Sequence, residues 1–130
     1  KLYIGNLYAK RDWGHAKDYV RAMWLMLQKK KPDDYVISTG KQYSIKDFIN
    51  LSADQLKLKI IWKKNKRGED YAINNIGQKI IETDKRYFRP TEVHNLVGNS
   101  TKAKKHLKWS PKIKIKALVK EMIDEEILKL

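Results

Sequence analysis

The feature that most constrains the fold is the stretch of residues 15–29, in which apolar side chains recur with the period of an α-helix. The recurring positions are Ala16, Tyr19, Val20, Met23, Trp24 and Leu27. Side chains three and four residues apart lie on one face of a helix. Because burial of an apolar face stabilises such a helix in a globular domain, we expect an amphipathic helix here, with this stripe in the core.

Short strand-like runs alternate with further helical stretches along the rest of the chain. Strands are expected at residues 2–5, 35–39, 58–62 and 79–83. Helices are expected from 44 to about 56, near 92–97, from about 101 to 107 and from about 115 to 128. Residues 63–78 are polar and are expected to form a loop or an irregular hairpin. The alternation predicts an α/β fold in one continuous unit.

Local signals mark the ends of several of these elements. Ser44 followed by Asp47 has the spacing of a capping box, and Asn99 or Ser100 is a suitable cap for the helix that follows. Residues 86–90 are expected to run extended, because the residue before Pro90 is pushed out of the helical region.

The composition excludes several function classes. The chain has 130 residues and no cysteine, which rules out disulfides and thiolate chemistry. No apolar run approaches the ~18 residues that a membrane span needs, and no signal-peptide pattern opens the chain. We therefore expect a soluble, cytoplasmic protein. Lys1 leads directly into an apolar strand-like run, so we also expect the carboxyl-terminal portion of a longer protein.

The net charge of +14 leaves an alternative open, a small basic module that binds nucleic acid. The excess is mostly lysine, spread through nearly every segment, with only five arginines. A nucleic-acid module would need arginines and exposed aromatic rings gathered on one face. Tyr19 and Trp24 instead belong to the apolar helix stripe, which favours a core role for both.

The sequence contains few catalytic signatures. It has no G-x-G-x-x-G, P-loop, H-E-x-x-H or G-x-S-x-G motif. The three histidines lie far apart without metal-ligand spacing, and we interpret them as structural or surface residues. The adjacent carboxylates at 33–34 and at 125–126 point in different directions, so they are interpreted as turn or solvated residues.

Two places are suited to binding an anion. Arg11 precedes the expected helix start at Gly14-His15, where free N–H groups and a guanidinium fork would form a phosphate cradle. In the segment RYFRPTEV, Arg89 is held by Pro90 and Glu92 follows three residues later. An arginine for phosphate beside a carboxylate for sugar hydroxyls indicates a nucleotide-sugar clamp. The alternative for each place is a surface salt-bridge network.

Five segments carry a resemblance to a known family. They are YIGNLYAKRDWGHAKDYVRAMWLMLQ, PDDYVISTG, YFRPTEV, TKAKKHLKWSPK and LVKEMI. In order and spacing they resemble the carboxyl-terminal half of the GDP-mannose 4,6-dehydratases, which belong to the extended short-chain dehydrogenase/reductase superfamily. The resemblance covers essentially the whole chain and is loosest between Lys63 and Gln78.

The resemblance implies that residues 1–130 are the carboxyl-terminal, substrate-binding part of a Rossmann-type enzyme. An amino-terminal Rossmann domain, absent from this chain, would hold NADP. The full enzyme would be a lyase of nucleotide-sugar metabolism, on the route to GDP-fucose. It would convert GDP-mannose to GDP-4-dehydro-6-deoxy-mannose and regenerate NADP within each turnover. The implied partners are GDP-mannose and further copies of the full-length protein, in a dimer or tetramer, with no nucleic acid and no membrane.

The resemblance also implies individual roles. Arg11 matches the arginine of the superfamily's R-D-[WY] motif, which contacts the nucleotide diphosphate, and Arg89 matches the second diphosphate arginine. Glu92 matches the acidic residue that accepts hydrogen bonds from the ribose hydroxyls. The backbone of residues 2–4 would lie along the guanine. The other substrate-binding residues expected are Tyr3 and Asn6.

No catalytic residue is expected within the chain. None of the seven tyrosines has a lysine four residues later, so the superfamily's Tyr-x-x-x-Lys pair is expected upstream. Four positions depart from the family pattern. They are Tyr8 for a common aspartate, Lys85 for a proline, Lys108 for a glycine and Lys114 for a Ser/Thr cap. We expect these departures to affect loop geometry and stability rather than the clamp.

Overall fold

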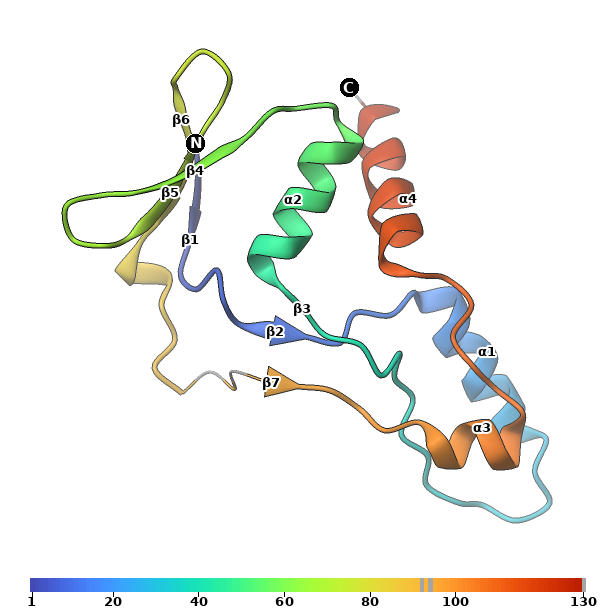
Figure 1. The fold of residues 1–130 in the computed structure, drawn as a ribbon. Helices are drawn as coiled ribbons and strands as arrows, with labels where there is room; N and C mark the ends of the chain where they lie inside the picture. The colour runs from blue at the N-terminus through green and yellow to red at the C-terminus, as the bar shows by residue number, and fades with distance from the viewer. Residues whose placement is uncertain (92, 94, 130) are drawn as a thin grey trace. The chain divides into compact units, whose positions relative to one another are not determined.

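The computed structural model describes residues 1–91, 93 and 95–129 (Figure 1). Its backbone contacts form two compact units, whereas the sequence predicts one continuous unit. The first unit comprises residues 1–9 and 44–94, and the second comprises residues 10–43 and 95–130. No helix among the described residues is long and apolar enough to cross a membrane.

The first unit is built on a four-stranded sheet with the order β1-β6-β5-β4. The strands are β1 (Leu2–Ile4), β4 (Ile61–Lys64), β5 (Asp70–Ile73) and β6 (Lys79–Thr83). β1 runs parallel to β6, while β4, β5 and β6 form an antiparallel meander. The tight turns of the meander contain Gly68 at φ +78° and Gly77 at φ +81°, a region that glycine enters without a steric penalty.

Helix α2 (Ile45–Gln55) precedes the meander in the chain and begins with the predicted capping box. The Ser44 hydroxyl accepts a hydrogen bond from the Asp47 N–H at 3.0 Å, and the Asp47 carboxylate accepts one from the Ser44 N–H at 2.9 Å. Trp62 on β4 donates its indole N–H to the side chain of Asn50 on α2 at 2.8 Å. The predicted helix is therefore confirmed and is attached to its sheet.

The second unit contains helices α1 (Ala16–Leu27), α3 (Thr101–Leu107) and α4 (Ile115–Ile127). A three-stranded sheet has the order β3-β2-β7, with β3 at Tyr43–Ser44, β2 at Lys10–Arg11 and β7 at Asn95–Leu96. β2 and β7 pair in parallel. The core of this unit consists of Ala22, Ala103, Leu107 and Trp109.

The side of α1 that packs into this core differs from the one predicted. Val20, Met23, Trp24 and Leu27 are exposed, by 54% for Trp24 and 81% for Leu27. The buried residues of the helix are Asp18 and Ala22. Small alanines at 22 and 103 belong to the core shared by α1 and α3, and the large Trp109 ring fills it from the following loop. The helix is confirmed, and Tyr19 packs against the core as predicted. The core placement of the other four large stripe residues was wrong.

Asp18 organises the loop between α3 and α4. Its carboxylate accepts hydrogen bonds from the N–H groups of Lys112 and Ile113, both at 2.8 Å. Its main-chain carbonyl accepts the Trp109 indole N–H at 2.9 Å. The first-turn aspartate, suited to the helix dipole, therefore also fixes a segment more than ninety residues away in the sequence.

Other predicted elements were shifted or wrong. The run 35–39 is not a strand. At its end the Thr39 N–H donates to the side chain of Asp12 instead of to a neighbouring strand. The strand expected at 58–62 begins at Ile61, and the polar stretch after it contains β5. A helix was expected near 92–97, but within that range Asn95 and Leu96 form β7; residues 92 and 94 lie outside the described residues. Residues 85–87 form a short 3₁₀ helix, η1 (Lys85–Tyr87), before the chain becomes extended at Phe88.

Candidate functional site

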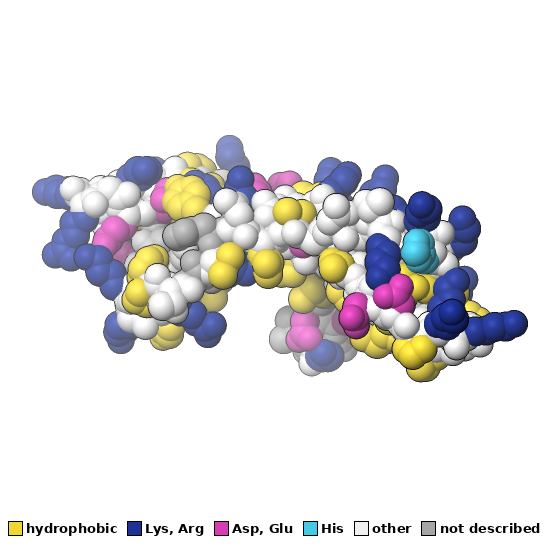
Figure 2. All heavy atoms as spheres, turned by 90° about the horizontal axis from the view of Figure 1, so that it is seen from below, with side chains coloured by type: hydrophobic (Ala, Val, Ile, Leu, Met, Phe, Trp, Pro, Cys, Tyr) yellow, Lys and Arg dark blue, Asp and Glu magenta, His cyan; other side chains and the backbone are white. Residues whose placement is uncertain are grey.

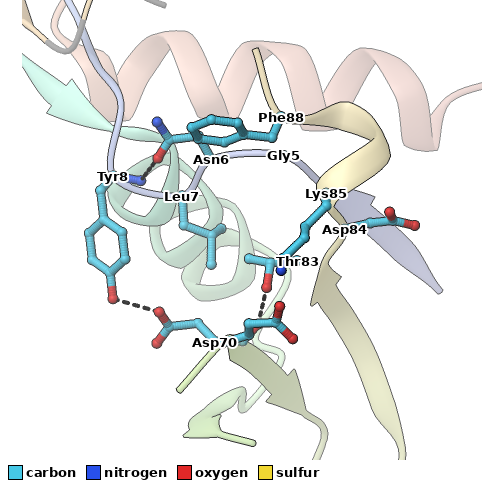
Figure 3. A pocket seen from close by; sticks show the side chains of 10 residues that line it. Gly5, Asn6, Leu7, Tyr8, Asp70, Thr83, Asp84, Lys85 and Phe88 are labelled. Atoms are coloured by element: carbon cyan, nitrogen blue, oxygen red, sulfur yellow. Dashed lines mark hydrogen bonds between the residues drawn. The ribbon is translucent and has the colours of Figure 1, made fainter. Parts of the chain in front are cut away.

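A cavity in the first unit is lined by Asn6, one of the predicted substrate-binding residues. It is also lined by the segment that leads to Arg89, another of them. Its volume is about 400 Å³. One wall is the turn after β1, residues 5–8, and another is the segment 83–88 around η1. Asp70 at the start of β5 closes one side (Figure 3). Asn6 therefore lies in the same cavity as Phe88, which directly precedes Arg89.

Close contact between two backbones fixes these walls. A Cβ atom on Gly5 would lie 2.0 Å from the carbonyl oxygen of Tyr87, so only glycine allows this approach. The Asp84 N–H donates to the Ile4 carbonyl at 2.9 Å and extends the pairing of β1 with β6. The Asp84 carboxylate caps η1 by accepting the Arg86 N–H at 2.9 Å. Gly5 of the YIGN segment thus allows the backbone of the YFRP segment to pack directly against it.

Asp70 is the buried acidic group of the cavity. The Tyr8 hydroxyl donates to its carboxylate at 2.7 Å, and Lys46 Nζ lies 3.6 Å from the other oxygen. The hydrogen bond to Asp70, followed by burial and the negative charge of Asp70, raises the pKa of Tyr8 above its ordinary value. Figure 3 shows the Tyr8 ring along this side of the cavity. The tyrosine that departs from the family pattern is therefore a partner for the buried carboxylate.

Asn6 shapes the turn that it occupies. Its side-chain oxygen accepts the N–H groups of Tyr8 at 2.9 Å and Ala9 at 3.2 Å, as asparagine does in tight turns. Tyr3 lies on β1 with its ring exposed, and Lys1 Nζ is 5.2 Å from the centre of that ring. The ring and the turn are on the same short stretch of chain.

The two clamp arginines belong to different units. Arg89 is exposed and follows Phe88 in the first unit. Arg11 is half-buried on β2 in the second unit, where Nη1 donates to the Lys10 carbonyl at 2.8 Å. The pairing of Arg11 with Arg89 on one diphosphate stays a prediction. Glu92 lies outside the described residues.

Asp12, which was not among the predicted functional residues, holds together the segments around Arg11. The Asp12 carboxylate accepts the N–H of Thr39 at 3.0 Å, the N–H of Gly40 at 2.8 Å and the N–H of Gly98 at 3.4 Å. It also accepts the Thr39 hydroxyl. Gly98 cannot be larger, because a Cβ there would lie 2.4 Å from the side chain of Ser38. The aspartate in the R-D-W motif was the available signal.

His15, and not the glycine before it, is the N-cap residue of α1. His15 Nδ1 accepts the Lys17 N–H at 3.0 Å, and Nε2 lies 3.1 Å from a Glu121 oxygen on α4. Nδ1 must therefore carry no proton, and Nε2–H donates to the carboxylate. The structural role expected for His15 is confirmed. Among the residues that the structure describes, no group of three or more histidines and carboxylates could hold a metal ion.

Comparison with solved structures shows the class of fold. The UDP-glucose 4-epimerase of Thermotoga maritima, solved with UDP-glucose, matches with a TM-score of 0.76 at 19% identity, over 99% of this chain and 35% of that one. The dTDP-glucose 4,6-dehydratase of Bacillus anthracis, solved with NAD, matches with a TM-score of 0.71 at 19% identity, over 98% and 34%. The chain therefore has the α/β fold of the matching parts of these two enzymes, and the α/β fold predicted from the sequence is confirmed.

Sequence comparison shows the family within that class. The sequence model of the GDP-mannose 4,6 dehydratase family matches residues 1–122. The GDP-mannose 4,6 dehydratase of Dictyostelium discoideum is 47% identical over 126 residues, which is 97% of this chain and 35% of the relative. The human enzyme of that name is 44% identical over 124 residues, 95% of this chain and 33% of the relative. The chain belongs to the GDP-mannose 4,6 dehydratase family, and it spans about a third of the length of these relatives.

The alternative of a nucleic-acid module receives no support from these matches. On the face drawn in Figure 2, the Lys and Arg side chains lie at several separate places among apolar and uncharged groups. Such scattered lysine is typical of a solvated surface rather than of one continuous phosphate-binding stripe.

Proposed function

We propose that residues 1–130 are the nucleotide-sugar-binding part of a GDP-mannose 4,6-dehydratase. The whole enzyme would be a lyase that converts GDP-mannose to GDP-4-dehydro-6-deoxy-mannose in the cytoplasm, as a dimer or tetramer. The observation that carries the proposal is the family match over residues 1–122. The seating of the YFRP segment against the YIGN turn supports it, because two motif segments far apart in sequence line one cavity.

In this proposal the chain binds and orients the GDP group. The guanidinium groups of Arg11 and Arg89 hold the diphosphate, whose geometry and charge they match. Glu92 accepts the ribose hydroxyls, the backbone of β1 lies along the guanine, and Tyr3 and Asn6 complete the site. Binding energy from the GDP group, which does not itself react, then positions the hexose for chemistry.

NADP would supply the hydride transfer when bound, but the residues present do not form its usual site. A dinucleotide loop needs glycines separated by a single residue, and no two of the six glycines here have that spacing. The Tyr-x-x-x-Lys pair of the superfamily is also missing from this stretch. We therefore assign NADP binding and the catalytic residues to sequence outside residues 1–130.

Arginine substitutions in the full-length protein test this proposal. Arg11→Ala and Arg89→Ala should each weaken GDP-mannose binding about ten- to hundredfold, because each removes charge-assisted hydrogen bonds of roughly 1.5–3 kcal/mol. Isothermal titration calorimetry measures the change. Arg21→Ala and Arg67→Ala, exposed arginines in the second and first units respectively, are matched controls and should bind normally. Unchanged affinity in both clamp variants would contradict the proposed roles.

A further inference from the structure

A second cavity lies wholly within the second unit and shares no lining residue with the proposed substrate site. Its volume is about 270 Å³. Its walls are Trp13, the segment 39–43, Lys104 on α3 and the segment 110–115 that leads into α4. The Asp18 carboxylate fixes that last wall through the amides of residues 112 and 113. The cavity is thus formed by segments that the core of the unit holds in place.

Three lysines line this cavity, Lys41, Lys104 and Lys114. Among the described residues, none of the three forms an ion pair with a carboxylate. Other lysines of the same unit do pair: Lys17 with Glu121 at 2.7 Å and Lys102 with Asp33 at 2.6 Å. Among the residues that the structure describes, these three lysines therefore lack a paired carboxylate, whereas Lys17 and Lys102 have one.

The carboxylate nearest in sequence to the cavity wall is already committed. Asp12, directly before Trp13, accepts hydrogen bonds from Thr39, Gly40 and Gly98. The Asp12 carboxylate therefore binds the amides of these loops and, within the described part of the chain, forms no ion pair with the three lysines. An exogenous anion would supply the missing counter-charge, and lysine binds phosphate as a point charge.

The other residues that line the cavity are suited to contact the uncharged part of a ligand that carries a phosphate. Trp13, Pro111 and Ile113 present apolar or aromatic surface, and Tyr43 and Ser110 carry hydroxyl groups. Flat rings stack on such aromatic side chains at a gain that does not depend on hydrogen-bond pattern. A few polar groups on a mostly apolar wall are typical of small-molecule sites.

We propose that this cavity binds a phosphate ester with an aromatic body, of about the size of a nucleoside monophosphate. The phosphate lies among Lys41, Lys104 and Lys114, and the ring lies against Trp13. The first amides of α4 add donors on the phosphate side, because the N-cap residue Lys114 makes no side-chain capping bond. This site is separate from the proposed GDP-mannose clamp, so either assignment can fail alone.

The test titrates the full-length protein with adenosine 5′-monophosphate while GDP-mannose saturates the clamp. Lys104→Gln/Lys114→Gln should weaken binding about tenfold or more, since it removes two of three cations. Lys105→Gln/Lys116→Gln is the matched control, because it loses the same charge from α3 and from the start of α4 at positions outside the cavity. Its affinity should equal that of the parent protein, and circular dichroism confirms that both variants fold.

Each other outcome overturns the proposal. Absence of adenosine monophosphate binding would mean that the cavity is not such a site. Equal weakening by both double variants would mean that lysine charge alone attracts the probe. Displacement of the probe by GDP-mannose would place it in the clamp. Inorganic phosphate is the second probe, and it should bind at least tenfold more weakly. Equal binding of inorganic phosphate would remove the role assigned to Trp13.

Discussion

At the scale of single residues, two carboxylates carry more of the structure than their positions in the sequence indicate. Asp18 and Asp70 are both buried, and each accepts hydrogen bonds from groups distant in the chain. A buried carboxylate costs free energy unless such donors satisfy it. Both residues are therefore expected to show large effects when they are replaced.

Asp18→Ala should lower the free energy of unfolding by about 2–4 kcal/mol. The substitution leaves the amides of Lys112 and Ile113 without their acceptor, and buried donors that lose a partner pay their desolvation cost. Urea denaturation of the full-length protein measures the change. Asp34→Ala, at an exposed position outside the helices and strands, is the control and should stay within about 0.5 kcal/mol of the parent. A loss as small as that for Asp18→Ala would contradict the role given to its carboxylate.

The Tyr8–Asp70 pair should give a pH dependence on the alkaline side. Because the pKa of Tyr8 is raised in the folded state, its stabilising effect is fully present below the tyrosine pKa of the unfolded chain. The effect is lost as the pH rises through the raised value. The stability advantage of the parent protein over Tyr8→Phe should therefore disappear at high pH. Denaturant titrations at neutral and alkaline pH measure it, and an advantage that persisted with rising pH would contradict the assignment.

At the scale of elements, helix ends explain two departures from the family pattern. Lys108, which closes α3, has φ +54° and ψ +29°. This left-handed conformation favours glycine, the residue that the family resemblance places there. Lys114 begins α4 without a side-chain capping bond, as its side chain predicts. Both lysines are tolerated because packing, more than end chemistry, supports the two helices.

Lys108→Gly should raise the free energy of unfolding by about 0.5–1 kcal/mol, because it relieves a left-handed conformation that lysine adopts at a cost. Thermal denaturation measures the shift. Lys105→Gly, inside α3, is the opposite control and should destabilise the protein by about 1 kcal/mol. A lower melting temperature for Lys108→Gly would show that the lysine side chain makes a contact worth more than the strain.

At the scale of the whole molecule, the sequence predicted elements better than it predicted which surfaces meet. The capping box and the apolar period located α2 and α1, since both are local signals. The buried face of α1 depends on Ala103 and Trp109, far along the chain, and no period along α1 encodes them. The strand β5 was not predicted, because four residues flanked by polar turns show little alternation of apolar and polar side chains. The contact of Gly5 with Tyr87 was equally hidden, although both motif segments were recognised.

The parallel pairing of β1 with β6 has a consequence for the order in which the protein forms. Leu2 lies opposite Ile81 in this pair, so β1 has no partner in this sheet when it leaves the ribosome, until β6 has been synthesised. The β4–β5–β6 meander, by contrast, can close as soon as its short turns emerge. The turn at Asn6 and the cavity beside it are therefore expected to be completed late, when the end of β1 joins a sheet already formed.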